Sequence, residues 1–253
     1  QLFRRLPPFE ANGRTLKVGL QTGDDFRFVR MGSEVLVELA HASAAEKRIW
    51  WVFAKGGAYS PYYSPQRLVV NWANDGAEVR NFIDPETGRT YSRPQATSFY
   101  FRPGLTWSDR TTKLFSARIW PANGVFSVKG SCGFFSGDEF LALGLMNSVV
   151  FNGLLSFLVG AAASAARSYQ VGTLGRVPFP ANGDTAIKEQ VSALALNGWK
   201  AKRDVDTADS TSASFIASPL LIVAGSTLAE RAAAWAARVR TSEETVTVIQ
   251  TEI

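Results

Sequence analysis

The chain has 253 residues, 46% of them hydrophobic and 19% charged, a composition that supplies a sizeable core and excludes global disorder. It holds one cysteine and one histidine, which excludes an internal disulfide and a structural zinc site. The formal net charge is +5.

The charge is unevenly distributed. Residues 1–130 hold 18 Lys and Arg against 11 Asp and Glu, whereas residues 131–253 hold 9 against 11. A basic first half is typical of a surface that meets a polyanion, although a solvated basic face has the same composition. No basic segment followed by an apolar run opens the chain, so no signal peptide is expected, and a cytoplasmic setting fits.

Residues 15–135 predict a β-rich lobe, because short aromatic and β-branched runs alternate with Gly, Pro and Asn. The individual predictions are strands at 67–72, 98–101 and 124–128, a helix at 33–47 and a loop at 81–95.

The sequence changes character at SGDE, residues 136–139, which matches a capping box: the Ser oxygen accepts a backbone N–H and the Glu side chain reaches back. Residues 140–166 then carry no charge, a pattern that also fits a membrane span. Asn147, Ser148 and Asn152 interrupt this run, and amides are costly in lipid, so we favour two buried helices that break near Asn147 and Ser148.

The rest of the chain reads as mainly helical. In order, it predicts an extended segment at 170–180, a helix at 184–203, a polar loop at 204–217, a helical region at 219–240 and a strand at 245–253.

Several kinds of chemistry are missing from the sequence. It has no Gly-x-Gly-x-x-Gly, no Walker loop and no Asn/Asp-Pro-Pro-Tyr/Phe tetrapeptide, the motif with which amino-methyltransferases hold the target base. His41 is expected to be a surface or packing residue, and Cys132, which has no histidine partner, a small buried side chain. The acid pairs Asp24-Asp25 and Asp138-Glu139 are typical of caps, so we expect no metal site and no catalytic residue.

Two segments mix cations, aromatics and hydroxyls. In WWVFAKGGAYSPYY (50–63), two glycines allow close approach of the backbone to a ligand, Lys55 suits a phosphate and the tyrosines can stack on bases. A glycine turn between two aromatic core strands is the structural alternative. In YFRPGLTWSDRTTKLFSAR (100–118), hydroxyls and cations interleave, as in loops that contact DNA, unless Asp109 pairs with Arg110 or Arg118 and stiffens the loop.

Longer stretches resemble a known family. GLQTGDDFRFV (19–29) is similar to the opening of the TaqI-like specificity domain of type IIG restriction–modification enzymes. FAKGGAYSPYY (53–63), VVNWANDGAE (69–78) and YFRPGLTWS (100–108) resemble the C-terminal part of the PglX family of BREX phage-defence methyltransferases. Further likeness lies in LGLMNS (143–148), YQVG (169–172), VPFP (177–180), KRDVD (202–206) and FIASP (215–219).

The resemblance implies the specificity part of an adenine-N6 DNA methyltransferase that recognises double-stranded DNA. The expected fold is α+β: a target-recognition domain at 1–180, β-rich at 15–135 and closed by a helical hairpin at 136–168, and a mainly helical segment at 181–253. In such proteins an upstream catalytic domain binds S-adenosylmethionine, so the resemblance implies that this cofactor belongs to a catalytic domain and not to this chain. The main alternative is a protein–protein docking module for the methyltransferase or other defence subunits, and no membrane partner is expected.

The residues predicted to contact DNA combine the chemistry of these segments with their place in the motifs. They are Gln21, Thr22, Lys55, Gly56, Gly57, Tyr59, Tyr62, Arg93, Gln95, Arg102, Trp107, Arg110, Thr111, Arg118 and Lys129.

Overall fold

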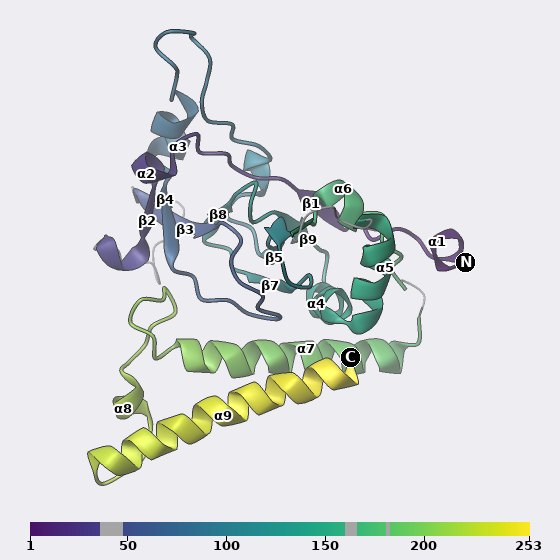
Figure 1. The fold of residues 1–253 in the computed structure, drawn as a ribbon, viewed down its shortest axis with the longest axis vertical. Coiled ribbons are helices and arrows are strands. Elements are labelled where there is room, and N and C mark those ends of the chain that lie inside the picture. Colours follow the sequence, from purple (N-terminus) through teal and green to yellow (C-terminus); the bar gives the residue numbers. More distant parts are fainter. Residues whose placement is uncertain (36–47, 160–165, 181–182) are drawn as a thin grey trace.

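The computed structural model describes residues 1–35, 48–159, 166–180 and 183–253, and Figure 1 shows a mixed α/β part with long C-terminal helices along one side. The strands are β1 (Thr15–Lys17), β2 (Val29–Met31), β3 (Trp50–Ala54), β4 (Leu68–Asn71), β5 (Gly104–Trp107), β6 (Arg110–Thr111), β7 (Ala117–Trp120), β8 (Gly124–Phe126), β9 (Cys132–Phe134) and β10 (Arg167–Ser168). The helices are α1 (Leu2–Arg5), α2 (Asp25–Phe28), α3 (Ala73–Arg80), α4 (Glu139–Asn147), α5 (Val149–Val159), α6 (Val171–Leu174), α7 (Thr185–Asp206), α8 (Pro219–Ile222) and α9 (Leu228–Glu252).

The strands form two four-stranded sheets and a short ribbon. The first sheet has the order β1-β9-β5-β7 and is antiparallel. The second has the order β2-β4-β3-β8, in which only β3 and β8 run parallel. β6 and β10 make a separate antiparallel ribbon. The chain crosses between the two sheets four times, after β1, β4, β7 and β8, and these crossings tie the sheets together.

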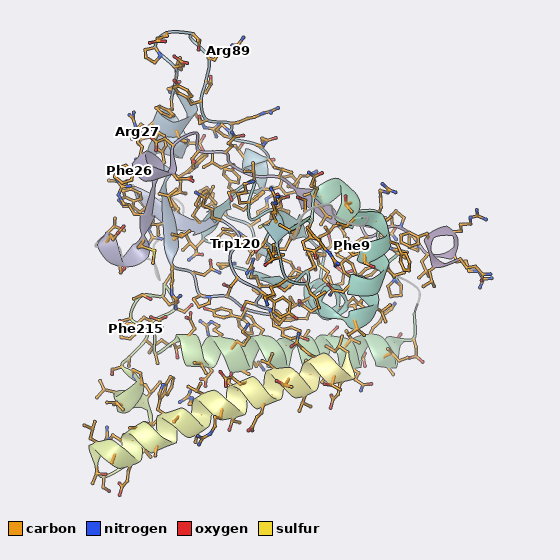
Figure 2. The ribbon with its side chains drawn as sticks, in the orientation of Figure 1. Phe9, Phe26, Arg27, Arg89, Trp120 and Phe215 are labelled. Atoms are coloured by element: carbon orange, nitrogen blue, oxygen red, sulfur yellow. The ribbon has the colours of Figure 1, made fainter. Side chains whose placement is uncertain are left out.

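The described residues form two hydrophobic cores. Phe9, Trp107 and Leu143 belong to the core between the first sheet and the helices, whereas Trp51 of the second sheet and Trp120 of β7 in the first sheet share the other core. Figure 2 shows Phe9 beside α5 and Trp120 in the middle of the molecule. Cys132 is buried and free, which confirms the prediction of a small buried thiol.

The helices cover the first sheet in two layers. α4 packs on α7, and α7 packs along α9, as Figure 1 shows. Gly144 allows α4 to pack closely on α7, because a Cβ at this position would lie only 2.6 Å from the Val191 side chain. α7 begins where the sequence predicts, with the Asp184 side chain accepting a hydrogen bond from the backbone N–H of Ala186.

The predicted break in the uncharged run is confirmed, because α4 ends at Asn147 and α5 begins at Val149. The two helices meet at a bend of 69°, which is not the expected antiparallel hairpin. Among the described helices none is by itself long and apolar enough to cross a membrane, and only this bent pair passes on length and composition.

Several local predictions are wrong. Residues 245–253 continue α9 rather than form a strand, because Val246 and Ile249 pack into the first core. α4 starts at Glu139 after Asp138, without the capping hydrogen bond predicted for Ser136. The segment 98–101 begins with a 3₁₀ turn, Thr97–Phe99.

One further prediction is wrong in part, and another lies mostly outside the described residues. Residues 170–180 are not fully extended, since they contain α6. Most of the helix predicted at 33–47, with His41, lies outside the described residues, and the part before it contains a 3₁₀ turn at Gly32–Glu34.

Candidate nucleic-acid interface

Loops from distant parts of the sequence meet along one line of backbone hydrogen bonds. Gln21 and Arg93 exchange two of them, with N···O distances of 3.1 and 2.7 Å. The neighbouring Leu20 carbonyl accepts from the N–H of Val128 at 3.0 Å. These contacts place the 20–25, 91–95 and 127–130 loops side by side.

The line continues into the ribbon. The Lys129 carbonyl accepts from the N–H of Asp109 at 3.0 Å, and Arg110 in β6 lies opposite Ser168 in β10. Four steps between adjacent backbones thus connect Arg93 to β10. At ~4.8 Å per step, the four steps span ~20 Å, about six base pairs of duplex at ~3.4 Å each.

Five exposed cations follow this line, and we call them the cationic strip: Arg93, Lys129, Arg110, Lys113 and Arg167. Within the described ranges none of their side chains forms an ion pair or a hydrogen bond. A folded protein gains little stability from such unpaired cations, so the strip is available to an anionic partner.

The other cations of the first half are mostly engaged. Arg14, Arg27, Arg67 and Arg80 form ion pairs with Asp138, Glu78, Asp209 and Asp75, respectively. Arg89 sits away from the strip's line of hydrogen bonds, at the tip of the loop beyond α3 in Figure 2. The basic character of the first half is therefore not one continuous surface, and the strip is its concentrated part.

A hollow of about 360 Å³ opens beside the strip. Its lining brings together four of the residues predicted from the sequence, namely Gln21, Thr22, Lys55 and Lys129. The floor also contains Phe53 and the acidic side chain of Asp25.

Lys55 is not a free cation in this hollow. Its ammonium forms an ion pair with Asp25, whose carboxylate also accepts a hydrogen bond of 2.6 Å from the Thr22 hydroxyl. Partial burial raises the pKa of Asp25, but the hydrogen bonds from Lys55 and Thr22 outweigh it and hold that pKa below its ordinary value. The carboxylate therefore stays charged and competes with any phosphate for Lys55.

The two glycines after Lys55 serve the chain itself. Gly56 has φ +74°, and a Cβ there would lie 2.7 Å from the Lys129 carbonyl oxygen. Gly57 accepts a hydrogen bond of 2.8 Å from the Ser108 hydroxyl. The sequence predicts that these glycines let a ligand approach the backbone closely. In the structure they instead let the end of β3 pack against the 127–130 turn.

Four predicted contact residues are buried, which corrects their assignment to the surface. One is Thr22, which is 6% exposed although it lines the hollow. Tyr62 and Trp107 are both 0% exposed, and Arg118 is 2% exposed. The Trp107 indole donates to the Tyr169 carbonyl at 2.8 Å. Arg118 donates to the Ala58 carbonyl at 3.1 Å and to the Ser108 hydroxyl at 2.6 Å.

Arg118 therefore positions the loops of the strip from below. Burial lowers its pKa to about 10, which leaves the guanidinium charged at neutral pH. Its hydrogen bonds tie residue 58 to residue 108, across the base of the hollow and the ribbon.

Four further predicted residues are held by neighbours. The Gln95 amide donates to the Gly19 carbonyl at 3.3 Å, and the Thr111 hydroxyl accepts from the N–H of Lys113 at 3.0 Å. The Tyr59 hydroxyl accepts from the Gln250 amide of α9 at 2.9 Å. The Arg102 guanidinium lies 5.2 Å from the centre of the Phe99 ring, where Lys17 also packs, and not on the line of the strip.

Sequence reasoning missed Arg167. It is the first charged residue after the uncharged run, but its partner strand lies more than fifty positions earlier, and no local pattern predicts that pairing. Among the described residues no group of three or more His, Cys, Asp or Glu side chains is arranged to hold a metal ion.

The chain is similar in sequence to segments of known proteins. No protein-family model matches the chain. The chain is 29% identical over 184 residues to the adenine-specific methyltransferase PglX of Lacticaseibacillus casei (strain Zhang), a match that covers 70% of this chain and 15% of that protein. It is 28% identical over 155 residues to the adenine-specific methyltransferase BrxX of Escherichia coli O9:H4 (strain HS), which covers 59% of this chain and 12% of that protein.

A solved structure shares the fold. The type IIL restriction-modification enzyme MmeI, determined in complex with DNA, aligns with a TM-score of 0.54 and 12% identity over 98% of this chain and 33% of that one. The chain thus spans a small part of each relative, 15% and 12% of the two methyltransferases. It is homologous to a segment of the adenine-specific methyltransferases PglX and BrxX, which confirms the family resemblance in its motifs.

Proposed function

We propose that this chain binds double-stranded DNA as the specificity part of an adenine-N6 DNA methyltransferase of a BREX or restriction–modification system. The observation that carries the proposal is the cationic strip: five exposed cations along one line of hydrogen-bonded loops, beside a hollow, with no ion pair to any residue that the structure describes. Such cations bind phosphates, and neighbouring polar side chains read base edges. The homology to PglX and BrxX supports the methyltransferase context.

In this proposal, a catalytic domain outside this chain carries out the methyl transfer. S-adenosylmethionine would bind there, and calorimetry of this chain with S-adenosylmethionine is expected to show no complex. The target adenine would be flipped into that domain while the strip holds the flanking duplex. A cytoplasmic location is part of the same proposal.

The test is an electrophoretic titration of a mixed-sequence 30-base-pair duplex at two salt concentrations. Binding is expected to weaken steeply with salt, since each phosphate contact releases counterions and contributes ~0.9 to the slope of log K against log salt. The variant Arg93→Glu/Lys129→Glu is expected to lose binding, whereas Arg240→Glu, a change at an exposed cation of α9, keeps it. Binding that is absent from the folded wild type, or equal in the two variants, contradicts the proposal.

One observation favours a second role in protein docking. On α5, a helix without any charge, Phe157 is 81% exposed, and Val149 and Val150 are exposed two turns earlier. Exposed apolar patches of this kind are typical of protein contacts. If α5 docks on a methyltransferase catalytic domain, Phe157→Glu abolishes co-purification with that domain and leaves DNA binding unchanged.

A further inference from the structure

The β6–β10 ribbon carries its two arginines on opposite faces. The register pairs Ser168 with Arg110 and Arg167 with Thr111. Residues directly opposite each other share a face of a ribbon, and successive residues alternate. Arg110 therefore lies on one face with Ser168, and Arg167 lies on the other with Thr111.

The base of the ribbon is fixed to the core. The N–H of Tyr169 donates to the Asp109 carbonyl at 2.6 Å, and the Tyr169 carbonyl accepts from the buried Trp107 indole at 2.8 Å. The Tyr169 side chain is itself buried, whereas Arg110, Arg167 and Ser168 are exposed. The chain after β6 also returns to the core at Phe115, which is buried, so the ribbon is fixed at both ends of β6 and presents its arginines on a rigid support.

The side chains of the ribbon and the adjoining turn suit contact with a polyanion on two sides. Arg110, Lys113 and Arg167 have no ion pair among the described residues, and the hydroxyls of Thr112 and Ser168 adjoin them in the sequence. Arginines on opposite faces cannot both touch one flat surface. They can both touch phosphates when the ribbon lies in a groove, because a groove has a phosphate wall on each side.

We propose that the β6–β10 ribbon enters the major groove of duplex DNA, with Arg110 directed to one phosphate wall and Arg167 to the other. The major groove of B-form DNA, ~12 Å wide, admits a two-stranded ribbon without distortion, whereas the minor groove, ~6 Å wide, must first be widened. This inference rests on the proposed function, and it adds Arg167 and Lys113 to the DNA contacts. Of the remaining strip, Lys129 then binds the backbone that flanks the groove, and Arg93, which pairs with Gln21, stays available to a base edge.

The experiment compares two 30-base-pair duplexes of the same mixed sequence. One is unmodified, and the other carries glucosylated 5-hydroxymethylcytosine, whose sugars fill the major groove. The wild type is expected to bind the glucosylated duplex at least ~10-fold more weakly. On the unmodified duplex, Arg110→Ala and Arg167→Ala each weaken binding about 5- to 10-fold at ~0.1 M salt and lower the salt slope by ~0.9.

Controls separate the possible outcomes. Arg240→Ala is the matched control, and circular dichroism verifies that each variant is folded. If the wild type binds both duplexes equally, or if the two substitutions weaken both duplexes to the same extent, the ribbon does not enter the major groove although the chain binds DNA. If the folded wild type binds neither duplex, the proposed function itself is overturned. The inference is supported if glucosylation weakens binding by the wild type and if Arg110→Ala and Arg167→Ala cause no further loss of binding to the glucosylated duplex.

Discussion

The side-chain amide of Asn147 exchanges two hydrogen bonds with the backbone of Ala117, both at 2.9 Å. Ala117 opens β7, the edge strand of the first sheet, and Asn147 ends α4. On the outer side of that edge, the backbone of Tyr62 pairs with the same stretch of β7. Asn147 and Tyr62 therefore take the place of a further strand, which explains a buried amide inside an otherwise apolar run.

Replacing this amide is expected to destabilise the fold. Asn147→Leu leaves the Ala117 N–H buried without an acceptor, and an unsatisfied buried group costs about 1–3 kcal/mol. Urea unfolding measures the difference, with Ser156→Ala, an exposed change on α5, as the control. A loss below about 0.5 kcal/mol means that the amide is not needed at the sheet edge.

The sequence predicts elements better than contacts. The strands at 67–72 and 124–128, the helix break at Asn147 and the start of α7 follow from local patterns and agree with the structure. The strand predicted at 245–253 fails because its alternating β-branched residues favour β structure locally, while packing of Ile249 against the core favours continuation of α9.

The site shows the same limit at the level of side chains. Loops rich in hydroxyls and cations mark the region of the strip, but the burial of Arg118 depends on what packs over β7. Likewise the pairing of Lys55 with Asp25 joins residues thirty positions apart, and that of β6 with β10 joins residues more than fifty apart. Such long-range contacts decide which cation is free, and no local pattern encodes them.

The Asp25–Lys55 ion pair predicts a gain of function. Asp25→Asn keeps an oxygen to accept from Thr22 but removes the charge that holds Lys55. Lys55 then becomes available to a phosphate, so DNA affinity is expected to rise several-fold and the salt slope to increase by ~0.9. Titration against the same duplex measures both.

The matched control for this change is Glu244→Gln, which alters the net charge equally at an exposed position of α9. If both variants bind equally well, the effect is one of overall charge, and Lys55 does not contact DNA. If Asp25→Asn binds more weakly than the wild type, the ion pair itself shapes the binding surface.

Gln21 and Arg93 are expected to set sequence specificity. Both are exposed, and their two mutual backbone hydrogen bonds hold them next to each other at the rim of the hollow. Gln pairs with adenine and Arg with guanine through two hydrogen bonds each, and each good pair contributes ~1–3 kcal/mol of discrimination. Arg93→Ala should therefore relax one position of the recognised site, and Gln21→Ala a neighbouring one.

Selection of bound duplexes from a randomised pool, followed by sequencing, measures this change. The variant Lys113→Ala is the comparison, since loss of a phosphate contact weakens binding to all sequences alike. Enriched sequences that are identical for the wild type and Arg93→Ala would remove Arg93 from base recognition and leave it a phosphate contact.

Lys202 predicts a pH dependence of stability. Its ammonium donates to the Ser60 hydroxyl and to the Pro61 carbonyl, beside a hollow of about 470 Å³ that Tyr63, Asp206 and Glu243 also line. Burial, and then the charge of Arg118, lower the pKa of Lys202 from 10.5 to about 8. Between these two values the unfolded chain binds the proton and the folded chain releases it.

The contribution of Lys202 to the free energy of unfolding is therefore expected to rise with pH from about 8 to 10, by at most ~1.4 kcal/mol per pH unit, and to be absent below pH 8. Burial raises the pKa of the Cys132 thiol, which lowers stability from about pH 9 upward and is common to both proteins compared below. Burial raises the pKa of Tyr62 to about 12, so tyrosine ionisation lowers stability only above pH 10. Urea unfolding at pH 7, 8, 9 and 10 isolates the effect by comparison with Lys202→Met, which keeps the apolar stem. Because Met does not titrate, the free energy of unfolding of the wild type should rise relative to that of Lys202→Met from pH 8 upward. Parallel curves would show that Lys202 keeps its proton in the folded state, held by Ser60 and Pro61.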